Sequence, residues 1–130
     1  MQYVSWKQGD PLVGGADDQS VKPKTWVNLK FGTDGELIKP DINAFAQIAT
    51  YINVKDAGGA TVLNVRFIRD PKGAADFTGE TAFDLAKGHK FSHTWFLMAK
   101  KGTPLAVQVY HDGKKPLVIG TREFKAAIGA

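Results

Sequence analysis

The stretch IATYINVKDAGGATVLNVRF, residues 48–67, decides the fold class. On both sides of KDAGGA (55–60), apolar side chains recur at every second position, which is the period of a β-strand with one buried face. The glycine-rich segment between the two runs predicts a turn. If the strands form a hairpin, pairing Ile52 with Leu63 places both apolar sets on one side and Arg66 on the other. We therefore predict an antiparallel pair of strands here.

The same alternation recurs in five further segments, separated by turn residues: TWVNLKF (25–31), TAFDLAKG (81–88), KFSHTWFLMA (90–99), PLAVQVYH (104–111) and PLVIG (116–120). KKGT (100–103) and Asp112-Gly113 between them predict two more hairpins, the second pairing Val109 with Leu117 and Val107 with Ile119. REFKAAIG (122–129) also alternates, although it could end as a short helix, and DINAFAQIAT (41–50) could hold one helical turn. Eight or nine short strands with regular turns predict an all-β antiparallel β-sandwich or jelly roll over residues 21–130.

The predicted core consists of apolar residues that share strand parity: Ile52, Leu63, Val65, Phe67, Phe83, Leu85, Val107 and Val109. A chain of 130 residues can bury such a core as one domain. With no cysteine, neither a disulfide nor a thiolate metal site can form. Hydrophobic residues at 43% and charged residues at 23% argue against general disorder.

The formal net charge of +4 comes from basic residues scattered over many turns, which favours solvated lysines over a nucleic-acid-binding stripe. The opening MQYVSWKQGD has no signal-peptide pattern, and no apolar run approaches the roughly 20 residues of a membrane helix. We therefore expect synthesis in a cytoplasm, with neither a membrane nor a nucleic acid as partner.

Three histidines, His89, His93 and His111, are the candidate metal ligands. A hairpin register could place His93 opposite His111, with Asp112 as a third ligand. The alternative is that these histidines are half-buried packing residues with one hydrogen bond each, and we expect no metal or other cofactor.

The acidic loop around Asp10, Asp17 and Asp18 could hold calcium with irregular ligands, but turn chemistry explains its aspartates and glycines more simply. No hydrolase elbow, zinc-protease motif or phosphate loop is present, and Ser92 and His93 point to opposite faces of a strand. We therefore expect no catalytic residues and no enzymatic activity.

Five residues on the faces opposite the predicted core form a candidate ligand or subunit surface: Trp26, Tyr51, Arg66, Phe96 and Tyr110. Aromatic side chains that project outward from a sheet can pack against another subunit or stack on sugar rings. Both interpretations remain open at this point.

The segment SWKQGDPLVGGADDQS (5–20) resembles the opening of small tail proteins of phages, particularly phages of actinobacteria, at Trp6, Gly9, Pro11, Leu12 and Asp17. It departs from that pattern after the acidic stretch, where the phage proteins continue into a helix. The resemblance implies a non-enzymatic virion protein, most simply a minor tail protein. Such a protein would form a homo-oligomer, bind other virion proteins and contact the host surface.

On this interpretation residues 1–20 are a docking arm, and Trp6, Pro11 and Leu12 are its partner-docking residues. The alternatives are a carbohydrate-binding module or adhesin that recognises a cell-surface glycan, and a capsid decoration protein.

Overall fold

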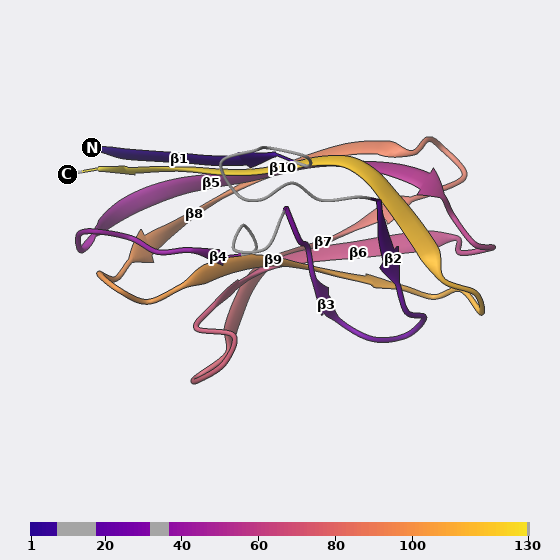
Figure 1. The fold of residues 1–130 in the computed structure, drawn as a ribbon, viewed down its shortest axis with the longest axis horizontal. Helices are drawn as coiled ribbons and strands as arrows, with labels where there is room; N and C mark the ends of the chain where they lie inside the picture. The colour runs from indigo at the N-terminus through magenta and orange to yellow at the C-terminus, as the bar shows by residue number, and fades with distance from the viewer. Residues whose placement is uncertain (8–17, 32–36, 130) are drawn as a thin grey trace.

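The computed structural model describes residues 1–7, 18–31 and 37–129, which form a two-layered β-sandwich (Figure 1). Its strands are β1 (Gln2–Lys7), β2 (Gln19–Val21), β3 (Val27–Asn28), β4 (Leu37–Ile38), β5 (Ala44–Asp56), β6 (Val62–Arg69), β7 (Asp76–Asp84), β8 (Lys90–Ala99), β9 (Leu105–His111) and β10 (Leu117–Gly129). Within the described ranges no residue is helical, and no helix is long and apolar enough to span a membrane. The predicted all-β fold is confirmed.

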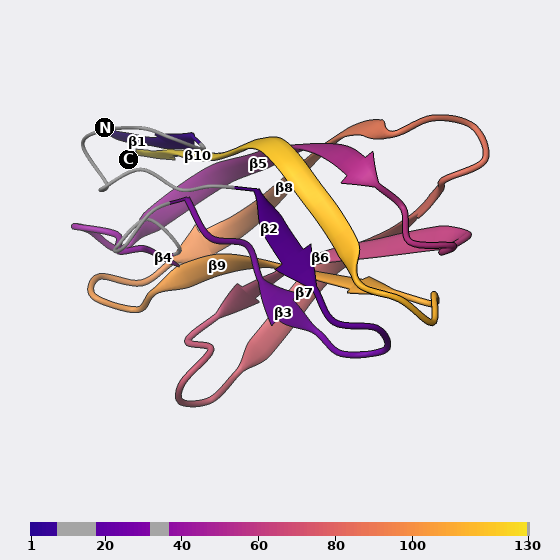
Figure 2. The same ribbon diagram turned by 45° about the vertical axis from the view of Figure 1, so that its right-hand side comes forward.

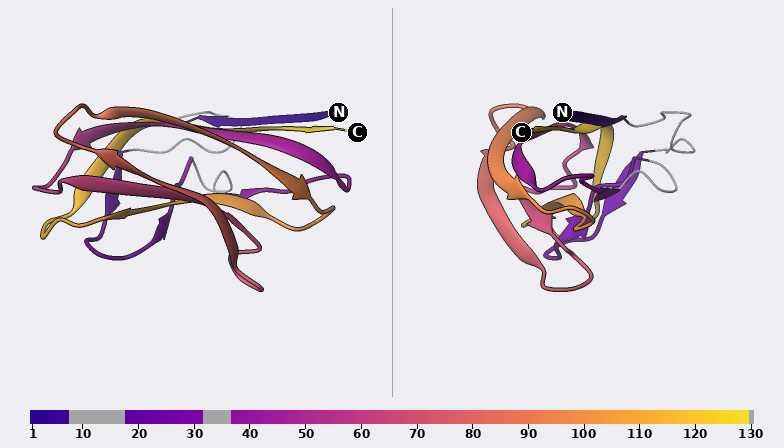
Figure 3. Two further views of the ribbon diagram at one scale, coloured as in Figure 1. Left: turned by 180° about the vertical axis from the view of Figure 1, so that it is seen from behind. Right: turned by 90° about the vertical axis from the view of Figure 1, so that its left-hand side faces the viewer.

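Two antiparallel sheets make up the layers, as the views in Figures 2 and 3 show. Sheet A has the order β1-β10-β5-β8, with β2 also paired to β10. Sheet B has the order β3-β9-β6-β7, with β4 also paired to β9. Both chain ends lie at the same end of the sandwich, where β1 runs beside the last half of β10 (Figure 1).

The predicted hairpins are wrong, because most consecutive strands lie in different sheets. β5 pairs with β10 and β8, whereas β6 pairs with β7 and β9, so the turn at 57–61 crosses from one layer to the other. The connections from β8 to β9 and from β9 to β10 also cross between the layers. Ile52 accordingly lies opposite Arg122 and Phe91 rather than Leu63.

The hairpin prediction fails because a hairpin within one sheet and a crossover between two sheets require the same alternation of buried and exposed side chains in their strands. In a hairpin the apolar side chains of both strands point to one side of a single sheet. In a crossover they point at each other from two sheets. Either arrangement buries the same residues, so burial alone cannot select between them.

The predicted core is confirmed. Seven of its eight members are at most 5% exposed, and Phe83 is partly buried against the same cluster. Phe67 from sheet B meets Phe124 from sheet A with ring centroids 6.2 Å apart, so the two layers interlock in the middle. The segment 122–129, for which a helix was the alternative, is strand in its entirety.

The described part of the predicted arm belongs to the sandwich. Gln2–Lys7 pairs with β10 over six residues, and Gln19–Val21 pairs with the other end of the same strand. Val4 and Trp6 pack against the core from the edge of sheet A. Residues 2–7 are therefore an edge strand rather than a free arm, because alternation in QYVSWK buries one side of this strand.

A β-bulge distinguishes the edge strand β7. The pairing of β6 with β7 shifts between Val65 and Phe67, next to Gly79, whose φ is +65°. A Cβ at Gly79 would lie 2.8 Å from the Trp95 indole, so only glycine fits this position. The Trp95 Nε1 donates to Thr78 Oγ1 at 3.1 Å, which ties β8 to β7 where the two sheets meet.

Candidate functional site

The structure brings three of the five predicted surface residues together on one sheet and places the other two on the opposite sheet. Trp26, Arg66 and Tyr110 meet on the outer face of sheet B, whereas Tyr51 and Phe96 lie on the outer face of sheet A. The sandwich therefore has two candidate surfaces on opposite sides.

The first surface, which we call the polar face, comprises Trp26, Asn28, Asn64, Arg66, Phe77, Gln108 and Tyr110. The Arg66 guanidinium lies between two rings, 3.9 Å from the Trp26 centroid and 4.3 Å from that of Phe77. Tyr110 packs on Trp26 with centroids 5.4 Å apart. These four side chains form a ladder across the sheet, from β3 to β7.

A row of hydrogen bonds runs beneath this ladder. Asn28, Gln108 and Arg66 occupy one register row of β3, β9 and β6. Arg66 Nε donates to Gln108 Oε1 at 2.9 Å, and Gln108 Nε2 donates to Asn28 Oδ1 at 3.0 Å. Burial among its neighbours lowers the pKa of Arg66, while the nearby Glu80 carboxylate acts in the opposite direction. The row thus fixes the guanidinium in a partly desolvated position.

Trp26 itself is held by the backbone around it. Lys24 N donates to His111 O at 3.0 Å and Leu29 N donates to Val107 O at 2.9 Å, so the main chain is tied to β9 on both sides of the tryptophan. Lys24 adopts a positive φ of 55°, which turns the chain into β3. The ring is therefore presented at a fixed position on the face.

The second surface, which we call the apolar face, comprises Tyr3, Phe45, Phe96 and Met98 on the outside of sheet A. Their exposed fractions are 75%, 56%, 53% and 57%, which is unusual for side chains of this size. Phe45 and Phe96 stack with centroids 5.7 Å apart, and Met98 lies directly opposite Phe45 in the strand register. All four gather toward the end of the sheet where the chain termini lie.

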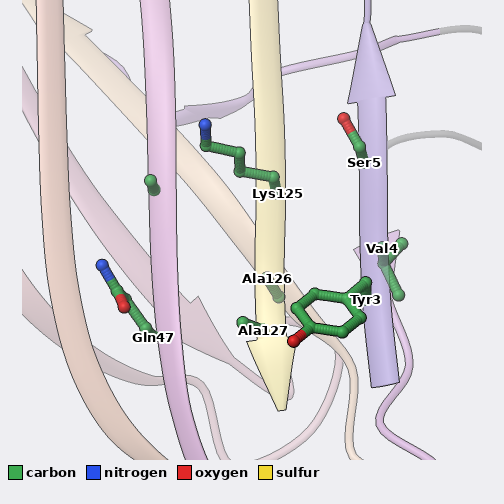
Figure 4. A pocket seen from close by; sticks show the side chains of 8 residues that line it. Tyr3, Val4, Ser5, Gln47, Lys125, Ala126 and Ala127 are labelled. Carbon is green, nitrogen blue, oxygen red and sulfur yellow. The ribbon is translucent and has the colours of Figure 1, made fainter. Parts of the chain in front are cut away.

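A hollow of about 370 Å³ adjoins the apolar face. Its floor contains Ala49 and Ala127, and its sides include Tyr3 from β1 and Gln47 from β5. In Figure 4, Tyr3 stands over the alanines of β10, with Lys125 and Gln47 across from it. Small residues on two adjacent strands leave this depression in an otherwise level sheet.

The partner-docking residues predicted for the arm have different outcomes. Trp6 is half-buried in the edge of sheet A, and its Nε1 has no hydrogen-bond partner within the described part of the chain. Pro11 and Leu12 lie outside the described residues, as do Asp10 and Asp17, so their docking and calcium roles stay predictions. Asp18 forms an ion pair with Lys55 at 2.6 Å.

The histidine pairing expected for a metal site is wrong. His93 lies opposite Thr50 in sheet A, and His111 lies opposite Leu63 in sheet B. His111 is a packing residue, but it is fully buried rather than half-buried and has two hydrogen-bond contacts rather than one: its Nε2 lies 2.9 Å from Val21 O, and its Nδ1 accepts from Gly113 N at 3.2 Å. Among residues 1–7, 18–31 and 37–129, no three His, Cys, Asp or Glu side chains gather closely enough to hold an ion.

Arg122 is a buried cation that the sequence patterns did not single out. It is 1% exposed, its Nε donates to Lys30 O, and its Nη1 donates to Gly120 O at 2.9 Å. Burial lowers its pKa, and the negative charge of Asp18 opposes that effect. These partners tie the inner side of β10 to the segment after β3, which is a structural role.

No protein-family model matches the chain, and no curated protein matches it. Among solved structures, it is similar to the globular domain of the zebrafish complement 1qA protein, with 12% identity, a TM-score of 0.57, and coverage of 100% of this chain and 98% of that one. Murine APRIL matches at 9% identity and a TM-score of 0.52, covering 86% of this chain and 98% of its own. At these identities the likeness shows the fold alone, a jelly-roll type of β-sandwich.

A third similar structure is a carbohydrate-binding module, the CBM35 from Cellvibrio japonicus Abf62. It is 10% identical with a TM-score of 0.49, and the match covers 98% of this chain and 99% of that one.

Proposed function

We propose that this chain is a non-enzymatic structural protein of a tailed-phage virion that assembles into a homo-oligomer through the apolar face. The observation that carries the assembly part is the gathering of Tyr3, Phe45, Phe96 and Met98 in exposed positions on one side of sheet A. Full burial of a Phe or Met side chain is worth about 1.5 to 3 kcal/mol. Several large apolar side chains exposed on one face of a small domain mark an interaction site.

The composition of the apolar face supports a protein as its partner. Aromatic residues and methionine are enriched at protein interfaces, whereas lysine and glutamate are depleted there. Three charged side chains of sheet A's outer surface lie along β1 and β10 on one side of this face: Glu123 is 3.6 Å from both Lys7 and Lys125, and Lys125 also lines the hollow. The aromatic and methionine side chains are therefore flanked by charge on one side.

A second copy of this chain fits the surface because protrusion and hollow lie on the same face. The stacked Phe45 and Phe96 stand beside the depression over Ala49 and Ala127. In a symmetric pair the same patch serves both partners, so a surface that contains both a knob and a socket can pack against its own copy. Other virion proteins would then contact the remaining surface of the oligomer.

The virion setting has a different and independent support, the resemblance of the opening segment at Trp6, Gly9, Pro11, Leu12 and Asp17 to phage tail proteins. The edge position of β1 is compatible with a docking role for the residues that follow it, because the outer side of an edge strand is open to a neighbour. Under this proposal the protein is made in the host cytoplasm and resides in the particle.

The test of assembly is the mass in solution of three forms: the wild type, Phe45→Ser/Phe96→Ser and Phe77→Ser. Phe77 is the control, because it is 60% exposed but lies on the other sheet. Light scattering coupled to size exclusion should show an oligomer for the wild type and Phe77→Ser, and a folded monomer for the double variant. A monomeric wild type at its highest soluble concentration, or an unchanged double variant, would reject the proposal.

The virion setting is tested separately, by mass spectrometry of purified phage particles. Peptides of this chain should be present in a defined copy number. If the protein oligomerises in solution but is missing from particles, the assembly proposal survives and the virion proposal fails.

A second candidate function, binding of carbohydrate, is favoured by a different observation. The polar face combines aromatic rings with amide side chains on an exposed sheet surface, away from the apolar face. This function is compatible with the first, because each copy in an oligomer would present its own polar face. It would make the protein an adhesin that contacts the host surface.

A further inference from the structure

The two outer faces of the sandwich differ in chemistry, although both carry aromatic side chains. Phenylalanine, methionine and small residues dominate the apolar face, whereas asparagine, glutamine and arginine surround the aromatic rings on the polar face. We propose that the polar face is a binding site for an oligosaccharide of neutral sugars. The proposal rests on the second candidate function, carbohydrate binding, and places it on named residues.

The aromatic ladder supplies a platform for sugar rings. One face of a pyranose presents several C–H groups, which are apolar and carry a slight positive charge, and the face of an aromatic ring is negative. Trp26 and Tyr110 lie together at one end of the ladder and are only half-buried. Phe77, at the other end, is 60% exposed. Arg66 lies over one side of Trp26 and of Phe77, so sugar units bound along this line would contact the remaining exposed surfaces of the rings.

The amide side chains supply hydrogen bonds to hydroxyl groups. An amide offers a donor and an acceptor, and so does a sugar hydroxyl, so the two pair well in a fixed geometry. Asn64 lies opposite Tyr110 in the register, on the same outer face, and no hydrogen bond of its side chain is recorded in the described part of the chain. Gln108 uses its oxygen for Arg66 and its nitrogen for Asn28, which holds the row in place. The site is thus partly organised before any ligand arrives.

The arrangement of Arg66 favours neutral over anionic sugars. Two rings lie against its guanidinium and its Nε is already bound to Gln108, so only part of its donor set is left for a ligand. Glu80 adds negative charge in its neighbourhood. Because Glu80 partly offsets the charge of Arg66, we expect a carboxylated or sulfated sugar to gain less from this cation than from an arginine with no acidic neighbour.

The experiment is an NMR titration of the full chain with soluble gluco-, xylo-, manno- and galacto-oligosaccharides. Polygalacturonate and heparin fragments serve as anionic probes. We expect at least one neutral oligosaccharide to shift backbone resonances of β3, β6 and β9. Tyr110→Ala should weaken that binding roughly tenfold, the equivalent of one lost aromatic contact and its neighbours. Tyr110→Phe should retain most of it, because the ring remains.

The matched control is Tyr51→Ala, since Tyr51 is also a half-buried tyrosine on an outer face but belongs to sheet A. It should leave the affinity unchanged, and thermal unfolding of each variant checks that the fold persists. Equal weakening by Tyr51→Ala, or preference for the anionic probes, would overturn the proposal. Shifts confined to the loops at 57–61 and 112–116 would retain carbohydrate binding but reject this site, whereas no binding by any probe would reject both.

Discussion

The carboxylate of Asp112 connects the two loops that cross between the sheets at one end of the sandwich. Its replacement by asparagine should lower the free energy of unfolding by an amount that depends on pH. Asp112 accepts hydrogen bonds from Thr61 Oγ1 at 2.5 Å, Thr61 N at 2.9 Å and Val62 N at 3.0 Å. The Thr61 hydroxyl first, and then the two backbone amides, lower the pKa of Asp112 from 3.8 to about 2. The loop before β6 is thereby fastened to the loop after β9.

A folded-state pKa below the unfolded value means that the ionised form stabilises the fold. This contribution is complete above the unfolded pKa of 3.8 and disappears as the pH falls through about 2. A difference of this size corresponds to at most about 2 to 3 kcal/mol at neutral pH. Because the carboxylate is exposed and screened by water, we expect about 1 kcal/mol.

The assay is urea unfolding of the wild type and Asp112→Asn between pH 7 and pH 2. The wild type should be more stable at neutral pH, and the difference should shrink as the pH approaches 2. Asp41→Asn is the control, because no hydrogen bond or ion pair of the Asp41 carboxylate is recorded within the described residues. Equal midpoints for Asp112→Asn and wild type at neutral pH, or a difference independent of pH, would refute this account of the loops.

Three further predictions concern the core, the bulge and the edge strand. Phe67→Ala should lower the free energy of unfolding by roughly 3 to 5 kcal/mol, because the ring is 1% exposed and contacts Phe124. Denaturant titration measures this loss, and a value below about 1 kcal/mol would contradict the interlocked core. Gly79→Ala should cost roughly 1 to 3 kcal/mol through its positive φ and the clash with Trp95, and a neutral effect on thermal unfolding would argue against the bulge. Deletion of residues 1–7 should lower the melting temperature, because it exposes one side of β10 and uncovers the core beneath Trp6. An unchanged melting temperature would show that the fold does not need β1.

The fold class and the core could be predicted from the sequence because both depend on strand parity. Alternation around the turn at 55–60 assigns Ile52, Leu63 and Phe67 to the inside whatever their partners are, and all three are buried. Which strands pair could not be predicted, since crossovers and hairpins satisfy the same parity. The contacts that select the crossovers, such as Phe67 with Phe124, join residues far apart in the chain.

The candidate surfaces were predicted in part for the same reason. Parity placed Trp26, Arg66 and Tyr110 on outer faces, but only the pairing of β3 with β9 and of β9 with β6 brings them together. Phe45 was missed because AFAQIAT was open to a helical interpretation. Its outward parity with Gln47 and Ala49 was the available signal, since the inward positions of the same run are filled by Ala46 and Ile48.

If both proposals hold, the opposite placement of the two surfaces links assembly to recognition. Sheet A carries the apolar face and sheet B the polar face, on the two outer sides of one sandwich. An oligomer that closes through sheet A therefore leaves sheet B directed outward in every copy. A single exposed aromatic platform binds sugar weakly, but several platforms on one particle gain avidity that can exceed the single-site affinity by roughly 10² to 10⁴. If both proposals hold, Phe45→Ser/Phe96→Ser should leave the affinity for a soluble oligosaccharide unchanged while it accelerates dissociation from a glycan-coated surface. Equal dissociation rates for the wild type and the double variant would show that the two faces act independently.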